Sequence, residues 1–264
     1  MPYTVNCSIM FTELPLLDRP RAAKAAGFGA VEFWWPFDVA VPPEKDVESF
    51  IRAVDDAGVQ LSGLNFFAGD MPGGDRGLLS WPERSGEFVD NIDVTLRIGQ
   101  RLGCRAFNAL YGNRVDGADA QEQDELATQN LVRATKATAG VGGTVLIEPV
   151  SGSERYPLLT AADALSAIDR AQAAGAGDNM ALLADLYHLQ TNGDDVEVVI
   201  AEHVSRIGHV QIADAPGRGE PGSGDLPLPD YVQALQDGGY RGWVGLEYKP
   251  TTDSTADSFG WHSS

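Results

Sequence analysis

Short apolar runs alternate with helix-like segments along the whole of this 264-residue chain. The runs carry almost no charge, which is typical of parallel strands that are covered by helices on both faces. We predict strands at residues 5–10, 30–34, 59–64, 105–110, 144–147, 180–185, 209–213 and 243–246. Eight strand–helix units in a chain of this length predict an α/β protein, namely a closed (β/α)8 TIM barrel.

The segments between these strands have the apolar periodicity of helices. In residues 44–57 the apolar side chains recur at i, i+3, i+4 and i+7 and so share one helical face. Thr160 is an N-cap candidate for a helix over residues 160–174. Further helices are expected at residues 16–26, 83–102, 120–139 and 229–237, and between the sixth and seventh strands.

An open, doubly wound sheet is the alternative to the barrel. It is less favoured because no GxGxxG motif follows the first predicted strand. The glycine-rich loop at residues 66–81 is not a nucleotide loop either, since it lacks the GK[ST] ending, and we expect a mobile loop over the site. No change of composition marks a linker, so we expect one domain over residues 1–264, with residues 248–264 as a polar C-terminal tail.

The chain carries 38 acidic and 19 basic side chains, for a formal net charge of −19. This charge opposes a nucleic-acid partner, whose binding requires neutralisation of phosphates. It is compatible with a small anionic substrate, because physiological salt screens exposed charges beyond roughly 8–10 Å.

The sequence shows no secretion signal, and no apolar run approaches the ~20 residues of a membrane span. We expect a cytoplasmic protein with buried free thiols at Cys7 and Cys104, and a homo-oligomer is left open.

Polar side chains stand at the ends of four successive predicted strands, the fifth to the eighth. They are Glu148, Asp185, Gln211 and Glu247, and all four offer oxygen atoms. The carboxyl ends of barrel strands face one cavity, so these side chains should converge. Three crowded carboxylates need a counter-charge. Because oxygen ligands suit hard ions, we predict one divalent metal ion, Mg²⁺ or Mn²⁺ rather than Zn²⁺.

Glu148 and Glu247 come from the outer strands of this group of four, so they should approach a bound substrate from opposite sides. Two carboxylates in this arrangement can remove a proton from one carbon and return it to the neighbouring carbon. The metal would polarise the carbonyl group and stabilise an ene-diolate. A single glutamate at a strand end is usually a solvated loop residue, so the prediction depends on the whole series.

His188 and Arg218 are further candidates, each with a simpler alternative. His188 could contact the substrate, or it could only cap a helix or pack. Arg218 lies in a Gly- and Pro-rich loop and could be a surface charge. If it reaches the cavity, it could hold a substrate carboxylate by a bidentate pair. At ~4 Å and an effective dielectric near 20, such a pair contributes ~4 kcal/mol before desolvation.

Several short motifs are distinctive when taken together. They are NCSIMFTE at residues 6–13, AGFGAVEF at 26–33, AGD at 68–70, GDRG at 74–77, IEP at 147–149, DLYHLQ at 185–190, QIAD at 211–214, PGR at 216–218 and GLEYKP at 245–250. On these motifs, which span nearly the whole chain, the sequence resembles the hydroxypyruvate isomerase family of xylose-isomerase-like TIM barrels.

The resemblance implies a metal ion on Glu148, Asp185, Gln211 and Glu247, with the two glutamates as proton donor and acceptor. It implies substrate contacts at His188 and Arg218. Gln211 favours this family over the ketose 3-epimerases, in which the third ligand is typically His. The implied reaction converts hydroxypyruvate to 2-hydroxy-3-oxopropanoate (tartronate semialdehyde). A four-carbon 2-oxo-tetronate substrate, a ketose epimerase or dehydratase activity, and a ligand-binding barrel without turnover are the alternatives.

The chain also departs from the family pattern. Gly219 stands where a His is usual, and residues 150–157 read VSGSERYP where an Asn and a Pro-Gly pair are usual. Pro20 and Arg21 occupy positions in the first helix where an aromatic residue is common. The first two departures fall on loops expected to face the substrate. They leave its identity open, as a small oxo-acid or a sugar acid.

Overall fold

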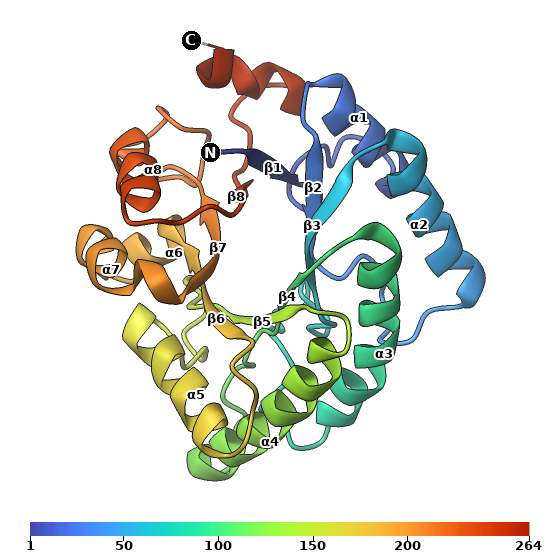
Figure 1. Ribbon diagram of the computed structural model, residues 1–264, viewed down its shortest axis with the longest axis vertical. Coiled ribbons are helices and arrows are strands. Elements are labelled where there is room, and N and C mark those ends of the chain that lie inside the picture. Colours follow the sequence, from blue (N-terminus) through green and yellow to red (C-terminus); the bar gives the residue numbers. More distant parts are fainter. Residues whose placement is uncertain (264) are drawn as a thin grey trace.

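Eight parallel strands form a closed barrel in the computed structural model, which describes residues 1–263 (Figure 1). Each strand pairs with the next, and β8 pairs with β1. The strands are β1 (Tyr3–Asn6), β2 (Ala30–Phe33), β3 (Gln60–Asn65), β4 (Ala106–Asn108), β5 (Thr144–Ile147), β6 (Met180–Asp185), β7 (Ile207–Ile212) and β8 (Val244–Leu246). The predicted TIM barrel is confirmed, and the open sheet is wrong.

The α-helices surround this ring of strands (Figure 1). The stripe predicted on α2 is buried against the barrel. Thr160 caps α5 as expected, and Asp163 completes a capping box with it. The helices are α1 (Arg19–Ala25), α2 (Glu44–Ala57), α3 (Ser85–Leu102), α4 (Ala120–Ala139), α5 (Ala161–Ala173), α6 (Leu186–Thr191), α7 (Val196–His203) and α8 (Leu228–Asp237), with the 3-10 segments η1 (Leu16–Asp18), η2 (Val204–Arg206) and η3 (Thr255–Ser263).

Some predicted boundaries are wrong. The first strand ends at Asn6 rather than at residue 10, because the chain turns there and the Met10 N–H donates to the Asn6 carbonyl at 2.9 Å. Asn6 therefore lies at the carboxyl end of its strand. The segment between β6 and β7 contains two helices, because the chain breaks at Asn192–Gly193 and Asp195 caps a new helix.

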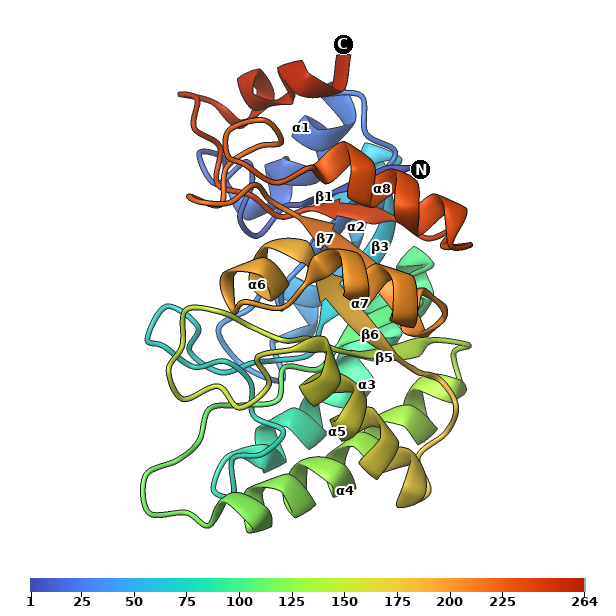
Figure 2. The ribbon, with the colours of Figure 1, turned by 90° about the vertical axis from the view of Figure 1, so that its left-hand side faces the viewer.

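The C-terminal segment η3 lies in space beside α1, a helix near the start of the sequence (Figures 1 and 2). The ring centroids of Phe259 and Phe28 are 4.7 Å apart. Thr255 accepts a hydrogen bond from the Phe11 N–H at 2.8 Å and is itself bonded to Glu13. These contacts fix the tail against the loop that follows β1.

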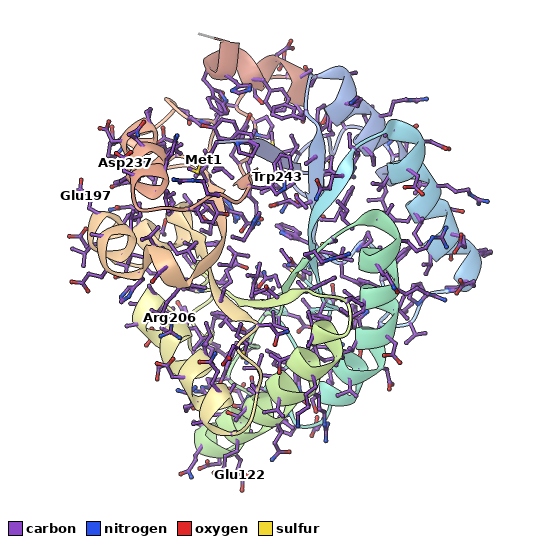
Figure 3. All side chains as sticks on the ribbon, viewed as in Figure 1. Met1, Glu122, Glu197, Arg206, Asp237 and Trp243 are labelled. Carbon is purple, nitrogen blue, oxygen red and sulfur yellow. The ribbon has the colours of Figure 1, made fainter. Side chains whose placement is uncertain are left out.

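Glu122, Glu197 and Asp237 are examples of charged side chains on the outer rim of the molecule, on α4, α7 and α8 (Figure 3). The apolar core fills the space between the strands and the helices. Cys7 and Cys104 are buried free thiols, as predicted. Within residues 1–263, no helix combines the length and the apolar character that crossing a membrane requires.

Candidate active site

The four predicted ligands lie at the carboxyl ends of β5 to β8. Asp185 is the last residue of β6 and pairs in register with Gln211 of β7, while Glu148 and Glu247 directly follow β5 and β8. All four side chains are buried. The barrel therefore brings three carboxyl groups and one amide into its interior at one end.

Asp185 is held by the helix that follows it. Its Oδ1 atom accepts the backbone N–H groups of Tyr187 at 2.9 Å and His188 at 3.2 Å, as the N-cap of α6. The other oxygen, Oδ2, is buried and has no hydrogen-bond partner among the described residues. This atom has only longer contacts, to His188 at 3.5 Å and Arg218 at 3.7 Å, and is available to bind a ligand.

Gln211 also leaves one oxygen free. Its Nε2 atom donates to Glu32 Oε1 at 2.7 Å and to Glu247 Oε2 at 2.5 Å. Its Oε1 atom is buried and has no hydrogen-bond partner among the described residues. Buried polar atoms are normally bonded, so two unpaired oxygens on adjacent strands indicate a cation site. The predicted ligands therefore fit a divalent metal ion with oxygen ligands.

Glu148, Asp185 and His188 each offer a ligand atom within 4.8 Å of the others. However, the Ser151 N–H donates to His188 Nδ1 at 3.1 Å, so the neutral ring carries its proton on Nε2. Nε2 lies 3.5 Å from Asp185 Oδ2 and 4.0 Å from Glu148 Oε1. Burial lowers the pKa of His188 to about 4, so the ring is neutral at pH 7. This geometry makes His188 a hydrogen-bond donor toward the site rather than a metal ligand.

Arg218 reaches the site. Its Nη2 atom lies 2.6 Å from Glu247 Oε1 and 3.7 Å from Asp185 Oδ2, and its guanidinium group stacks over the Tyr187 ring. The backbone of Arg218 has a φ of 62°, an uncommon conformation for a residue other than glycine. A metal ion or a substrate carboxylate at this position would share or displace the contact between Arg218 and Glu247.

The two glutamates hold protons more tightly than carboxyl groups in water. Burial, followed by the negative charge of Asp185, raises the pKa of Glu148 to about 8. Burial also raises the pKa of Glu247 well above its usual value, although Arg218 opposes this shift. Like charges and a low dielectric both disfavour ionisation of these two carboxyl groups. The positive charge of a divalent cation would oppose this effect and restore the ionised forms. The raised pKa of Glu148 suits a group that exchanges a proton near neutral pH.

The residues that support this set were not among the predicted site residues. Asn108 donates to Glu148 Oε2 at 2.6 Å, Asn6 donates to Glu247 Oε2 at 2.6 Å, and Tyr156 donates to the Glu148 carbonyl at 3.0 Å. Glu32 and His209 form a buried pair within the barrel, with 2.6 Å between Oε2 and Nε2. The signal in the sequence that could have identified Asn6, Glu32, Asn108 and His209 was a polar residue inside or at the end of an apolar strand.

The loop at residues 66–81, which we expect to be mobile, contacts the neighbouring loops. The Gly112 N–H donates to the Arg76 carbonyl at 3.0 Å, and Asn113 Nδ2 donates to the Gly74 carbonyl at 3.0 Å. Ser153 in turn donates to Asn113 Oδ1 at 2.9 Å. The loops that follow β3, β4 and β5 therefore contact one another on one side of the barrel (Figure 2). The mobility of the loop stays a prediction.

Comparisons with known proteins place this chain in a family. Residues 20–264 match the family described as xylose isomerase-like TIM barrel. The chain belongs to this family. Its members share the barrel architecture described above, so the family and the fold agree.

Three relatives are similar to this chain over nearly its whole length. A Streptomyces coelicolor protein named "Putative hydroxypyruvate isomerase" is 53% identical over 263 residues, which cover 98% of this chain and 94% of the relative. The 2-oxo-tetronate isomerase of Cupriavidus necator is 33% identical, with 98% and 96% covered. The crystal structure of a Brucella melitensis protein named AP endonuclease, family 2 has a TM-score of 0.89 and 34% identity, and covers 100% of this chain and 98% of its own. The resemblance to hydroxypyruvate isomerases and the expectation of an isomerase are confirmed by the first two relatives.

Proposed function

We propose that this protein is a metal-dependent isomerase that interconverts hydroxypyruvate and 2-hydroxy-3-oxopropanoate. The main support is the pair of buried glutamates at the carboxyl end of the barrel, whose pKa values are raised by burial. The free oxygens of Asp185 and Gln211 support a divalent metal ion, Mg²⁺ or Mn²⁺, beside that pair. We assign Glu148, Asp185, Gln211 and Glu247 as its ligands.

The reaction moves one hydrogen between neighbouring carbon atoms. One glutamate removes a proton from C3 of hydroxypyruvate, the C2 carbonyl oxygen gains a proton, and the other glutamate returns a proton to C2 while the C3 hydroxyl loses its own. A bound metal would polarise the substrate carbonyl. The hydrogen bonds from Asn108 to Glu148 and from Asn6 to Glu247 hold the two carboxyl groups in place.

Two further side chains suit substrate binding. We assign Arg218 to the substrate carboxylate, since its guanidinium group lies within the acidic cluster and offers several N–H donors. We assign His188 as a donor to a substrate oxygen, because its Nε2–H faces Asp185 and Glu148. A 2-oxo-tetronate is the second candidate substrate, and the relative from Cupriavidus necator favours it.

We propose no nucleic-acid partner, although the Brucella melitensis relative carries the name of an endonuclease. The chain has a net charge of −19. Binding to DNA gains most of its affinity from basic side chains that neutralise phosphates. A small anionic substrate instead needs one local cation, and Arg218 supplies it.

The decisive experiment is a substrate panel with the purified protein. Hydroxypyruvate, 2-oxo-tetronates and ketoses are each incubated with the Mn²⁺- and Mg²⁺-loaded protein, and products are identified by NMR. We expect turnover of hydroxypyruvate and its loss after chelation, with recovery on metal addition. Turnover of a ketose without any turnover of oxo-acids would reject the proposal in favour of an epimerase.

Variants test the two-glutamate mechanism separately. Glu148→Gln and Glu247→Gln each keep the shape of the side chain but remove its acid–base function. We expect each to lower kcat by at least about 10²–10⁴-fold, the usual contribution of a general acid or base. Circular dichroism and thermal unfolding check that the fold is intact. Full activity in either folded variant would reject the mechanism.

A further inference from the structure

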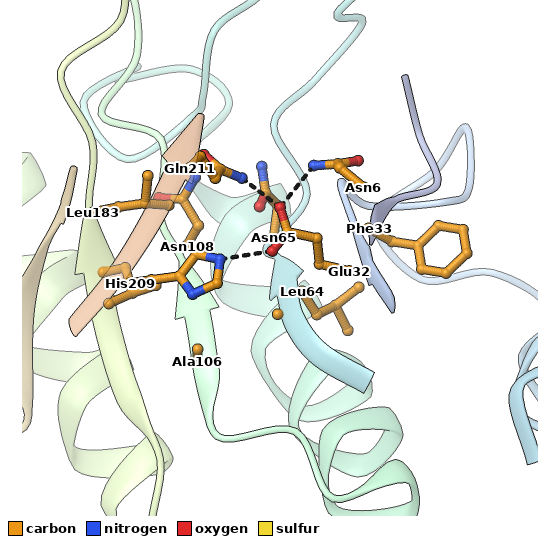
Figure 4. A pocket seen from close by; sticks show the side chains of 12 residues that line it. Asn6, Glu32, Phe33, Leu64, Asn65, Ala106, Asn108, Leu183, His209 and Gln211 are labelled. Carbon is orange, nitrogen blue, oxygen red and sulfur yellow. Dashed lines mark hydrogen bonds and ion pairs between the residues drawn. The ribbon is translucent and has the colours of Figure 1, made fainter. Parts of the chain in front are cut away.

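Glu32 is a buried carboxyl group to which the proposed reaction gives no role. It lies on β2 and is 2% exposed. Its Oε1 atom accepts Asn6 Nδ2 at 3.2 Å and Gln211 Nε2 at 2.7 Å, while Oε2 lies 2.6 Å from His209 Nε2 (Figure 4). Both oxygens therefore already bind donors of the protein. Glu32 also lies outside the four candidate ligands at the carboxyl ends of β5 to β8.

The space around Glu32 is too small for a substrate. The cavity that Figure 4 shows has a volume of about 10 Å³. Sites for small ligands are about 300–1,000 Å³. Glu32 must therefore act through the side chains that it touches, and Gln211 is the one that also belongs to the proposed metal site.

The contact with Glu32 decides which way the Gln211 amide points. Both N–H bonds of Gln211 Nε2 are used by carboxylates, one by Glu32 Oε1 and the other by Glu247 Oε2. A reversed amide would place its oxygen against both carboxylates, and an ionised carboxylate has no proton to donate to it. The observed orientation leaves Oε1 unpaired for a ligand. A metal ion needs this oxygen, because the amide nitrogen has no lone pair to offer.

The residues around Glu32 keep it within hydrogen-bond distance of Gln211. His209, two residues before Gln211 on β7, holds Oε2 across the barrel interior (Figure 4). Gly245 on β8 leaves the required room, because a Cβ atom there would come within 2.7 Å of Glu32 Oε1 and 2.9 Å of Gln211 Cγ. Three strands thus contribute to a packed arrangement in which Glu32 can approach Gln211.

We propose that Glu32 is a positioning residue, fixed by His209, that holds Gln211 with its carbonyl oxygen facing the metal ion. This inference rests on the proposed function, since it presumes the metal site. Removing an outer partner of a metal ligand typically weakens metal binding by about 10–100-fold. The same range is expected here when Glu32 loses its charge.

The test measures Mn²⁺ affinity from the electron paramagnetic resonance signal of free Mn²⁺, without substrate. We expect Glu32→Gln to raise the Kd for Mn²⁺ about 10–100-fold. Glu13→Gln, which removes a carboxylate bonded to Thr255, is the control for charge and should match the wild type. Unchanged affinity in a folded Glu32→Gln protein overturns the inference. Absence of Mn²⁺ binding by the wild type rejects the metal site itself.

A second background separates positioning from a general structural effect. The double variant Glu32→Gln/Gln211→Glu exchanges the two groups and keeps the total charge. Both oxygens of a carboxylate at position 211 are equivalent, so its orientation no longer depends on residue 32. We compare it with the single variant Gln211→Glu, and expect the two to bind Mn²⁺ within about threefold of each other. Equal weakening by Glu32→Gln in the wild-type and in the Gln211→Glu background overturns the positioning role.

His209→Leu provides an independent measurement if Glu32→Gln does not fold. It keeps Glu32 but removes the donor that fixes Oε2. We expect weaker Mn²⁺ binding in the same assay, in the same direction as for Glu32→Gln. Wild-type affinity in a folded His209→Leu protein would overturn the role of His209.

Discussion

Arg218 combines three features that rarely occur together by chance. Its backbone adopts a left-handed conformation, its guanidinium group contacts a buried carboxylate, and its side chain stacks on an aromatic ring. A non-glycine residue in this conformation costs of order 1–3 kcal/mol, which the surrounding contacts must offset. The strained loop thus fixes one cation beside the proposed metal ligands, where we propose that the substrate carboxylate binds.

Arg218→Gln should therefore raise KM for an oxo-acid substrate by at least about tenfold, with a smaller change in kcat. A charged hydrogen bond contributes about 1.5–3 kcal/mol, and its loss affects substrate binding directly. Steady-state kinetics with hydroxypyruvate measure both constants. Arg21→Gln is the matched control, because Arg21 pairs with Asp18 on the exposed surface. Equal KM values for Arg218→Gln and wild type would remove Arg218 from the substrate site.

At the scale of elements, the strand ends position the site, and at β6 the helix that follows also orients a candidate ligand. Asp185 shows this directly, since it ends β6 and caps α6 with the same side chain. One carboxylate oxygen serves the helix and the other stays free for the site. The start of a helix thereby sets the orientation of a candidate ligand.

The helix α5 offers a test of local stability away from this chemistry. Thr160 accepts the Asp163 N–H, and Asp163 accepts the Thr160 N–H, in a capping box. Thr160→Ala should lower the free energy of unfolding by about 1 kcal/mol. Thermal or denaturant unfolding measures the loss, Thr160→Ser should retain most of the stability, and kcat/KM should stay unchanged. Equal stability of Thr160→Ala and wild type would contradict the cap.

The sequence predicted elements well where the determining signals are local. The limits of α4 and β5 agree with the prediction because Asp119 caps the helix and glycines precede the strand. The end of β1 was wrong because the apolar run continues beyond the turn at Asn6. The candidate ligands were predictable from strand ends. The pair of Glu32 and His209 was not, since β2 and β7 meet only inside the closed barrel.

Considered as a whole, the barrel gathers several acidic groups in its interior. Glu32, Glu148, Asp185 and Glu247 are all buried, and Arg218 lies beside two of them. Burial raises the pKa of Glu148 and of Glu247, so ionising both glutamates without a metal ion is unfavourable. Binding of a cation to the folded state alone would stabilise the protein, by about 2.7 kcal/mol at a hundredfold excess over Kd.

The metal-free protein should lose stability as pH rises from about 5 to 8. The pKa of Glu148 is about 8 in the folded protein and about 4.5 for an unperturbed carboxyl group, so the folded state holds a proton that the unfolded state has lost. The slope for one such group approaches about 1.4 kcal/mol per pH unit, and the raised pKa of Glu247 acts in the same direction.

Thermal unfolding across this pH range, with EDTA and with saturating Mn²⁺, measures the effect. We expect the unfolding temperature to fall with pH in EDTA, and to fall much less with Mn²⁺, because the cation stabilises the ionised carboxylates. Glu148→Gln should reduce the slope in EDTA, since the amide does not titrate. A wild-type slope that is equal with and without metal would contradict the link between these carboxyl groups and a cation. At neutral pH the folded protein is thus expected to be less stable without a metal ion, and to be stabilised when the oxygen atoms of the barrel interior bind one.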